Sequence, residues 1–165
     1  MTLPKVSVIT VVYNAVALLE RTILNIRSQT YPNIEYIIID GGSTDGTLEI
    51  IKKHEGLIDL WKSEADNGLY DAMNKGLEAA SGDFVWFINA GDLIYSEDTT
   101  AMVFEGVDLI YDVYYGDTMI VDQEYHEIGL RRLRPPENLS WKSFKKGMLV
   151  CHQSILINKK LTEPY

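Results

Sequence analysis

Polar side chains follow four apolar runs in the first part of the chain, and their types suit hydrogen bonding and cation binding. They are Thr10 and Tyr13-Asn14 after the first run, Asp40 after the second, Glu64, Asp66 and Asn67 after the third, and Asn89 and Asp92 after the fourth. In an open α/β sheet, ligands bind outside the carboxyl ends of the strands. We therefore expect these side chains to converge on a binding site at one edge of a sheet.

The first turn after an apolar run, residues 11–20, contains no glycine. A dinucleotide fold requires a G-x-G-x-x-G there, and the Walker A loop that cradles phosphates is also absent from the sequence. Phosphate would then be held most simply by a divalent cation on carboxylates, and Mg²⁺ and Mn²⁺ prefer oxygen ligands. Asp92, at the end of a strongly apolar run, is the best candidate ligand for Mn²⁺ or Mg²⁺.

Each candidate also has an ordinary structural explanation. Asp40 could order the glycine turn that follows it, and Asp66 could cap the next helix. Asp71 and Lys75 are four residues apart, the spacing of a surface ion pair on a helix. His152 lies in an apolar run, where a lone histidine is more often a hydrogen-bonded core residue than a ligand. Convergence at one edge is what favours a site.

Alternating patterns predict the elements that position these groups. Short β-branched runs predict strands over residues 6–12, 34–39, 58–62 and 84–88, and apolar spacing predicts helices over residues 15–29, 47–54 and 69–80. The third helix has its apolar stripe on Leu69, Ala72, Met73, Gly76, Leu77 and Ala80, and Gly82 is placed to end it. Such alternation implies βαβ units and an α/β three-layer sandwich with a mostly parallel central sheet.

The alternation fades after Asp92. We expect one or two strands in residues 108–121, a long loop with a short helix in residues 130–146, and a last strand in residues 149–157. The 165 residues suit one domain. We divide it into a ligand-binding half, residues 1–95, and a second, incomplete half, residues 96–165.

The net charge of −9 argues against nucleic acid as a partner. Residues 131–146 are the exception, with six Lys and Arg against one acid, Glu137, together with Trp141 and Phe144. Such a stretch is usually a solvated face, and a peripheral contact with an anionic membrane is the other expectation. The N-terminus lacks signal-peptide character, no apolar run is long enough to span a bilayer, and Cys151 is the only cysteine, so we expect a cytoplasmic location, at most peripheral at the inner face of the membrane.

Four blocks of the sequence resemble glycosyltransferase family 2. The strand VITVVYN (residues 8–14) is similar to the family's opening strand, and IIDGGSTDGT (38–47) to its specific second-strand signature. SEADNGLYDAMNKG (63–76) resembles the third block of a bacterial polysaccharide-synthesis branch. FINAGD (87–92) stands where the family carries its D-x-D-type metal motif.

The resemblance implies a GT-A fold, that of nucleotide-diphospho-sugar transferases, and a nucleotide-sugar donor, most often a UDP-sugar. Thr10 and Tyr13 would then line the base pocket, Asp40 would accept a hydrogen bond from the base, and Asp71 and Lys75 would lie near the ribose or diphosphate. Asp66, Asn89 and Gly91 belong to the same implied donor site, and Asp92 would bind the metal. An inverting transfer to a glycan or lipid-linked acceptor, in cell-surface polysaccharide synthesis, is the implied reaction.

Two departures qualify the resemblance. The metal motif retains a single acid, Asp92, and His152 in a late family-like block is a candidate second ligand. The family's catalytic base falls beyond Tyr165, so we expect a chain that stops before the enzyme is complete, and a homodimer would be one way to cover the exposed edge. A non-catalytic nucleotide-sugar-binding module is therefore the alternative. A nucleotidyltransferase is disfavoured because residues 11–20 offer no glycine-rich basic loop.

Overall fold

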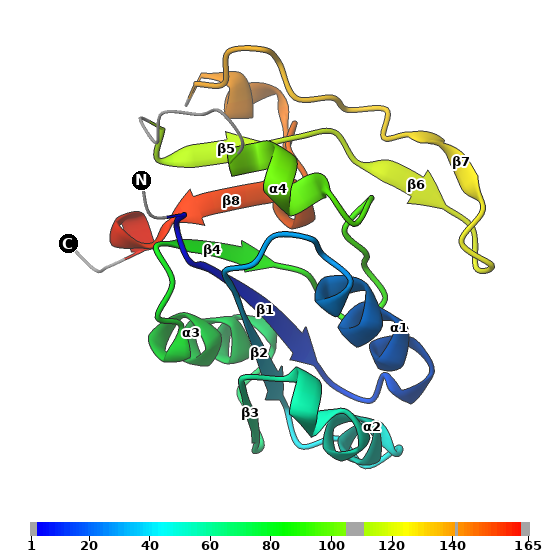
Figure 1. Cartoon of the computed structure of the whole chain (residues 1–165). Helices are drawn as coiled ribbons and strands as arrows, with labels where there is room; N and C mark the ends of the chain where they lie inside the picture. Colours follow the sequence, from blue (N-terminus) through cyan, green and yellow to red (C-terminus); the bar gives the residue numbers. More distant parts are fainter. Residues whose placement is uncertain (1–2, 105–110, 141, 163–165) are drawn as a thin grey trace.

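The computed structural model describes residues 3–104, 111–140 and 142–162 (Figure 1). It is an α/β fold with a mostly parallel six-stranded sheet, as predicted. The elements of the first half are β1 (Val6–Val12), α1 (Val16–Arg27), β2 (Ile34–Asp40), α2 (Thr47–Lys53), the 3₁₀ turn η1 (Glu55–Leu57), β3 (Leu60–Ser63), α3 (Leu69–Ala79) and β4 (Phe84–Phe87). Those of the second half are α4 (Thr99–Phe104), β5 (Val113–Tyr115), β6 (Met119–Val121), β7 (Glu127–Leu130), η2 (Ser143–Lys146), η3 (His152–Ser154), β8 (Ile155–Asn158) and η4 (Lys159–Thr162).

The strand order β3-β2-β1-β4-β8-β5 places β1 in the middle of the sheet. β1 to β4 run parallel, whereas β8 pairs antiparallel with both β4 and β5. Val12 of β1 pairs with Asp40 of β2, and Asp40 pairs with Ser63 of β3. The carboxyl ends of these three strands are therefore in register, and the loops that follow them begin side by side at the same edge of the sheet.

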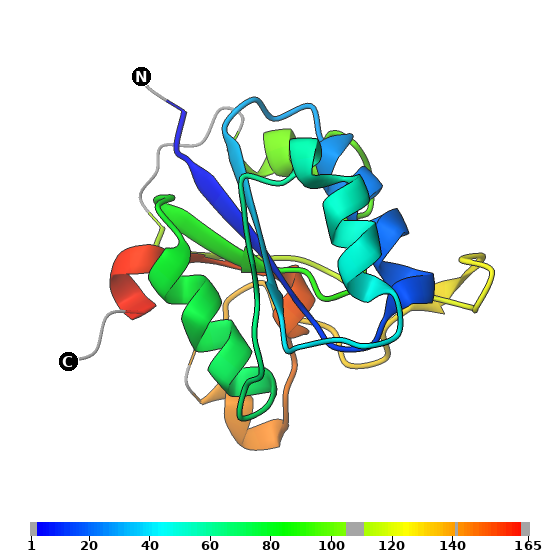
Figure 2. The same cartoon turned by 90° about the horizontal axis from the view of Figure 1, so that it is seen from below.

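Helices cover both faces of the sheet (Figure 2). On one face α1 and α2 bury Leu19, Ile23 and Ile51 in a large apolar cluster with β1 and β2. On the other face α3 packs against a second cluster that contains Ile9 and Ile39. Each fully buried side chain of this kind contributes about 1.5–3 kcal/mol. Because both faces are covered, every residue of β1 is buried, which explains its continuous β-branched composition.

Two details of the predicted third helix are wrong. Leu69 is 52% exposed and does not join the core stripe, because it occupies the first turn, beyond the edge of the sheet. Gly82 does not cap α3, which ends at Ala79 with Ala80 in an extended conformation. A Cβ atom at Gly82 would lie 2.7 Å from the amide nitrogen of Ser7, so the glycine permits close packing of this turn against β1.

The amino edge of the sheet is held by Glu35. Its carboxylate accepts hydrogen bonds from Lys5, Ser7 and Ser81, which joins β1, β2 and the turn after α3. Burial alone raises the pKa of Glu35, but these hydrogen bonds outweigh it and hold the pKa at about 2. The ion pair is thus a structural feature, at the edge opposite the polar strand ends.

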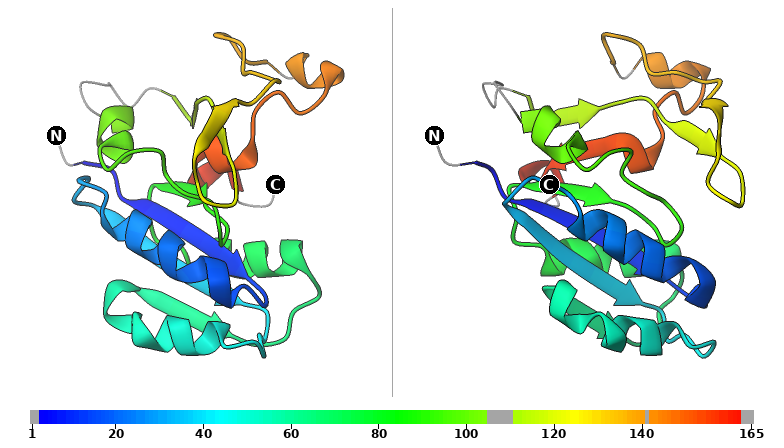
Figure 3. Two further views of the ribbon diagram at one scale, coloured as in Figure 1. Left: turned by 90° about the vertical axis from the view of Figure 1, so that its right-hand side faces the viewer. Right: turned by 45° about the vertical axis from the view of Figure 1, so that its right-hand side comes forward.

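The second half differs more from expectation. Helix α4 and strand β7 were not predicted, and the predicted last strand starts later, at Ile155, because His152–Ser154 form a 3₁₀ turn. The strands expected within residues 108–121 are β5 and β6, although residues 108–110 lie outside the described part. β6 and β7 form a separate two-stranded hairpin that projects beside α1 (Figure 3). In the described part of the chain, no helix has the length and apolar character needed to cross a bilayer.

Candidate functional site

A hollow of about 540 Å³ lies where the ends of β1 and β2 meet the start of α3. We call it the strand-end pocket. It is lined by Val11, Val12, Tyr13, Gly41, Gly42, Ala65, Asp66, Gly68, Leu69 and Ala72. The predicted site residues Tyr13 and Asp66 therefore come together here, and the exposed Leu69 forms part of the wall.

Backbone and small residues shape the strand-end pocket. A Cβ atom at Gly41 would lie 2.6 Å from Oδ2 of Asp66, so a larger residue at position 41 would require the Asp66 side chain to move. Oδ1 of Asp66 accepts a hydrogen bond from the amide of Gly68, 2.8 Å away, at the start of α3. The ring of Tyr13 is 65% exposed, which leaves it available to stack on a planar ligand.

Asp40 is completely buried beneath this pocket. Its Oδ2 atom accepts hydrogen bonds from the amides of Gly42 and Ser43 and from the Ser63 hydroxyl, and its Oδ1 atom from the Ser43 hydroxyl. The ordinary explanation for Asp40 therefore describes its geometry. It fixes the turn that forms the pocket floor, and its contact with a base stays a prediction.

Thr10 does not reach the pocket. Its hydroxyl is fully buried, donates to the carbonyl of Ile88 at 2.7 Å and lies 3.1 Å from the Tyr36 hydroxyl. The expectation that its side chain lines the base pocket fails, because the side chain lies in the core, between the hydroxyl of Tyr36 on β2 and the carbonyl of Ile88. Its hydroxyl instead ties β1 to the residue that follows β4.

Asp71 and Lys75 lie on α3, beside the pocket wall. Oδ2 of Asp71 accepts a hydrogen bond from the Asn67 amide at 3.0 Å, and this bond, with help from Lys75, lowers the pKa of Asp71. Nζ of Lys75 lies 2.9 Å from Glu64 and 3.3 Å from Asp71, and these carboxylates raise the pKa of Lys75. The ion pair expected from the spacing is present, with Glu64 as an additional partner that the spacing did not indicate.

The turn after β4 carries the remaining candidates. The amide of Asp92 donates to the carbonyl of Asn89 at 2.9 Å, which closes the turn, and Gly91 adopts a φ of 98° that favours glycine. Oδ2 of Asp92 accepts a hydrogen bond from Nε2 of Gln153 at 2.9 Å. Nδ2 of Asn89 lies 3.1 Å from Nε2 of His152. The η3 turn therefore contacts both polar side chains of the β4 turn.

The oxygen atoms of this turn suit a hard divalent cation. Within the described residues, Oδ2 is the only carboxylate oxygen of Asp92 with a hydrogen-bond partner, and Oδ1 of Asn89 is buried without one. Two oxygen atoms on one turn are the donors that Mn²⁺ and Mg²⁺ prefer. His152 is exposed, and its Nε2 already faces Asn89, so its role as a metal ligand stays a prediction.

A second hollow, of about 520 Å³, lies between this turn and the hairpin. We call it the hairpin pocket. It is lined by Trp86, Gly91–Tyr95, Thr99, Asp117–Val121, Tyr125, Glu127, Arg131, Cys151 and Gln153. Sequence reasoning missed this pocket, because the segment after β4 meets residues 117–131 and 151–153, which are far from it in the chain, and the pattern of residues 117–131 does not indicate a pocket wall.

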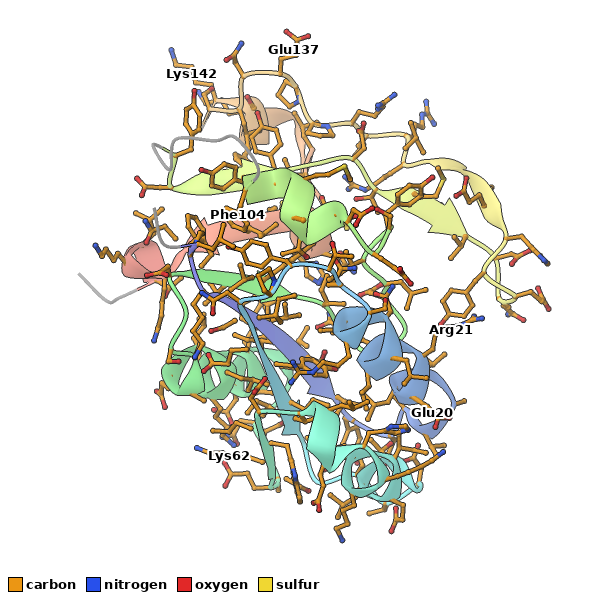
Figure 4. All side chains as sticks on the ribbon, viewed as in Figure 1. Glu20, Arg21, Lys62, Phe104, Glu137 and Lys142 are labelled. Atoms are coloured by element: carbon orange, nitrogen blue, oxygen red, sulfur yellow. The ribbon has the colours of Figure 1, made fainter. Side chains whose placement is uncertain are left out.

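The hairpin is attached to the core by Tyr125, at its tip. Arg21 on α1 is labelled in Figure 4. Its guanidinium stacks over the Tyr125 ring at 3.9 Å, and the Tyr125 hydroxyl donates to the carbonyl of Gly91 at 3.3 Å. Near the same tip, Asp122, Glu124 and His126 form an exposed group with metal-ligand spacing. Exposed acidic groups are common without an ion, and we assign none to this one.

The basic stretch of residues 131–146 is less available than its composition suggests. The Arg131 guanidinium donates to the carbonyls of Leu133, Met148 and Leu149, and Arg134 pairs with Asp117. Trp141 lies outside the described residues. Contact of this stretch with a membrane therefore stays a prediction.

Comparison with known proteins gives consistent matches. The model of Glycosyl transferase family 2 matches residues 7–162. An uncharacterized glycosyltransferase of Mycobacterium tuberculosis is 36% identical over 164 residues, which cover 96% of this chain and 60% of the relative. A PGL/p-HBAD biosynthesis glycosyltransferase of the same species is 32% identical over 166 residues, covering 98% and 62%. The chain thus spans about 60% of the length of these relatives.

Solved structures agree on the fold. The mannosyltransferase PcManGT from Pyrobaculum calidifontis, in complex with GDP-Man and Mn²⁺, superposes with a TM-score of 0.62 and 29% identity, covering 70% of this chain and 36% of that one. TarS residues 1–349 of S. aureus, in complex with UDP-GlcNAc, gives a TM-score of 0.52 at 27% identity, covering 60% and 29%. Mannosyl-3-phosphoglycerate synthase from Rubrobacter xylanophilus shares the fold at 18% identity, with a TM-score of 0.63 over 96% of this chain and 54% of that one.

Proposed function

Because this chain belongs to glycosyltransferase family 2, we propose that it binds a nucleotide-diphosphate sugar, a UDP-sugar in particular, and serves sugar transfer to a glycan or lipid-linked acceptor. The observation that carries the proposal is the common edge of the sheet. The strand-end pocket and the oxygen-rich β4 turn both follow carboxyl ends of parallel strands, on adjacent strands β1 and β4. The strand-end pocket suits a planar base, and the oxygen atoms of the β4 turn suit the metal that accompanies a diphosphate, so one ligand with both parts could bind along this edge.

Different residues along this edge bind different parts of the donor. In the proposal, Tyr13 and the glycine turn hold the base, and Lys75 lies on the side where the ribose and diphosphate extend. Asp92, with Asn89 beside it, holds Mn²⁺ or Mg²⁺. When bound, that metal neutralises negative charge on the leaving diphosphate. PcManGT, solved with GDP-Man and Mn²⁺, supports this assignment of donor and metal to the chain.

The transfer itself is an in-line attack by an acceptor hydroxyl on the anomeric carbon, which inverts that carbon. A carboxylate base would take the hydroxyl proton. We assign no residue of this chain to that role. A nucleotide-sugar-binding module without turnover is accordingly one outcome of the test below.

Calorimetric titration with UDP, with and without Mn²⁺, tests the proposal. We expect UDP to bind, Mn²⁺ to tighten its binding, and Asp92→Asn to remove this tightening. Tyr13→Ala should weaken UDP binding by about tenfold whether or not Mn²⁺ is present, since a stacked base contributes about 1–3 kcal/mol. Glu78→Gln, at an exposed residue of α3, removes the same formal charge as Asp92→Asn and should change neither measurement.

Absence of UDP binding by the unaltered chain would overturn the donor proposal. Tightening by Mn²⁺ that survives in Asp92→Asn would remove the metal from this turn. Chromatographic detection of glycosylated acceptor then separates an enzyme from a binding module, because the module binds the UDP-sugar and forms no product.

A further inference from the structure

The hairpin pocket meets the proposed donor site at Asp92. This residue follows β4 and lines the hairpin pocket, whereas the strand-end pocket lies over β1, β2 and β3, on the other side of β1 in the sheet order. A donor bound along the edge would place its sugar near Asp92. A molecule in the hairpin pocket would then lie next to the reacting carbon, which is the place of an acceptor.

The surface of the hairpin pocket is largely apolar. Three residues of its lining, Tyr95, Ile120 and Val121, are 69%, 42% and 38% exposed, so they leave apolar surface for a ligand to cover. Behind them lie the buried Trp86 and Ile94. A ligand that covers these groups would gain about 25 cal/mol for each Å² of apolar surface removed from water.

The charged groups of this pocket already have partners. Asp117 pairs with Arg134, with Nε of Arg134 3.0 Å from its Oδ1, and Arg131 donates to three main-chain carbonyls. The Glu127 carboxylate raises the pKa of the Tyr95 phenol, chiefly through a hydrogen bond. Asp92 accepts from Gln153.

The balance of charge in the lining is acidic. Asp92, Asp117 and Glu127 contribute three carboxylates to the lining, against the guanidinium of Arg131 in the lining and that of Arg134, which pairs with Asp117. With both guanidinium groups counted, the carboxylates still outnumber the cations, so an anionic ligand would meet net negative charge. The negative charge of the pocket therefore disfavours binding of phosphorylated or carboxylated ligands.

We propose that the hairpin pocket binds the acceptor, and that this acceptor is an uncharged amphipathic molecule whose hydroxyl lies near Asp92 and whose apolar portion packs on the hairpin. The inference rests on the proposed function, because the pocket is an acceptor site only if the donor lies along the neighbouring edge. It selects neutral glycosides with an apolar aglycone over phosphorylated sugars. The hairpin then determines acceptor specificity without contacting the donor.

Saturation-transfer NMR with three probes, in the presence of UDP and Mn²⁺, tests the proposal. The probes are phenyl β-D-glucopyranoside, methyl β-D-glucopyranoside and glucose 6-phosphate. We expect the phenyl glycoside to bind about tenfold more tightly than the methyl glycoside, because added apolar contact in a pocket is worth about 1–3 kcal/mol. Glucose 6-phosphate should bind more weakly than either.

Matched variants on the hairpin locate the binding. Ile120→Ser, within the pocket, should weaken binding of the phenyl glycoside by about fivefold or more. Ile128→Ser should leave this binding unchanged, since Ile128 is 70% exposed and lies outside the lining. Glu127→Lys should reduce the discrimination against glucose 6-phosphate. Circular dichroism of each variant confirms that the hairpin change has not unfolded the chain.

The possible results separate this inference from the proposed function. Equal or tighter binding of glucose 6-phosphate, equal effects of the two serine variants, or no binding of any probe by a chain that still binds UDP would each overturn the acceptor proposal and leave the donor proposal standing. Failure to bind UDP would refute the proposed function. Probe binding that depends on Ile120 in such a chain would still define a site for a neutral amphipathic ligand, without its role as acceptor.

Discussion

The strand-end pocket and the hairpin pocket are built from contacts of different range. Asp40 bonds mostly to residues two and three positions away in the turn it orders, with one further bond to Ser63, 23 positions away, and Asp66 bonds to the amide two positions on. In the hairpin pocket, Asp92 bonds to Gln153 across 61 residues and Tyr125 to Gly91 across 34. The first pocket is therefore shaped by local turns on a buried sheet, and the second by the docking of distant segments.

This difference predicts which property of the protein a single substitution changes. A change in a local turn should disturb the sheet edge and hence the stability of the whole domain. A change in a long-range contact should alter one function of the site while the domain remains folded. Three substitutions, in order of decreasing expected effect, test this contrast.

Asp40→Ala should have the largest effect. It removes the buried acceptor of hydrogen bonds from two partly buried amides and two hydroxyls. Leaving these donors without their partner should lower the free energy of unfolding by about 2–4 kcal/mol. Urea denaturation followed by circular dichroism measures this change.

Asp66→Ala serves as the local control for Asp40→Ala. Asp66 is partly exposed, and its one protein hydrogen bond among the described residues is to the Gly68 amide. Loss of this hydrogen bond should lower the free energy of unfolding by about 1 kcal/mol. If Asp40→Ala instead unfolds at the same urea concentration as the original chain and loses UDP binding, the Asp40 carboxylate acts on the ligand and not on the turn.

Gln153→Met should have an intermediate effect, confined to the metal. The amide of Gln153 fixes Oδ2 of Asp92, and its Oε1 atom accepts from the Cys151 thiol. Hydrogen bonds to a ligating carboxylate orient it, and their loss typically weakens metal binding by about 10–100-fold. Calorimetric titration of Mn²⁺ into the UDP complex should show this loss, with UDP affinity unchanged when Mn²⁺ is absent.

Gln29→Met is the matched control for Gln153→Met. Gln29 also makes long-range amide contacts, donating to the carbonyl of Ser96 and accepting from Thr100, but it lies away from Asp92 in a buried position. It should destabilise the fold and leave Mn²⁺ affinity unchanged. Equal Mn²⁺ affinities for the Gln153→Met variant and the original chain would show that Asp92 needs no orientation by η3.

The same contrast explains how much the sequence could predict. The parallel half of the sheet follows from the β-branched runs, and Tyr13 and Asp66 follow from their positions at strand ends. Thr10 was misplaced because a polar residue near a strand end can point to solvent or into the core, and the alternation of a buried strand does not distinguish the two. Asp40 is also buried, and its contact with a base stays a prediction. Gly76 is buried on the predicted stripe of α3, and it must lack a side chain there, because an added Cβ would lie 2.5 Å from Ile9.

Long-range contacts left no local pattern to find. Strand β7 has four residues and is exposed at most positions, and the two apolar residues on one face, Ile128 and Leu130, are too few to indicate a strand. The bond between Asp92 and Gln153 joins residues whose types alone indicate nothing about each other. Composition likewise could not show that Arg131 and Arg134 of the basic stretch have partners, because only the folded chain provides them.

Arg21→Met should have the smallest effect and the most local one. The substitution keeps an unbranched side chain on α1 and removes the cation that stacks on Tyr125 at 3.9 Å. At an exposed site such a contact is worth about 0.5–1 kcal/mol, so we expect the amides of β6 and β7 to exchange hydrogen about two- to fivefold faster. Amides of β1 and β2 should exchange at their original rates, because no residue of the hairpin lines the strand-end pocket.

Arg27→Met is the control for this prediction. Arg27 lies on the same helix but is directed toward Tyr36 and Asp59, so its substitution should leave exchange in the hairpin unchanged. If both variants accelerate exchange in the hairpin equally, the hairpin responds to the stability of α1 as a whole, and the two pockets are not independent.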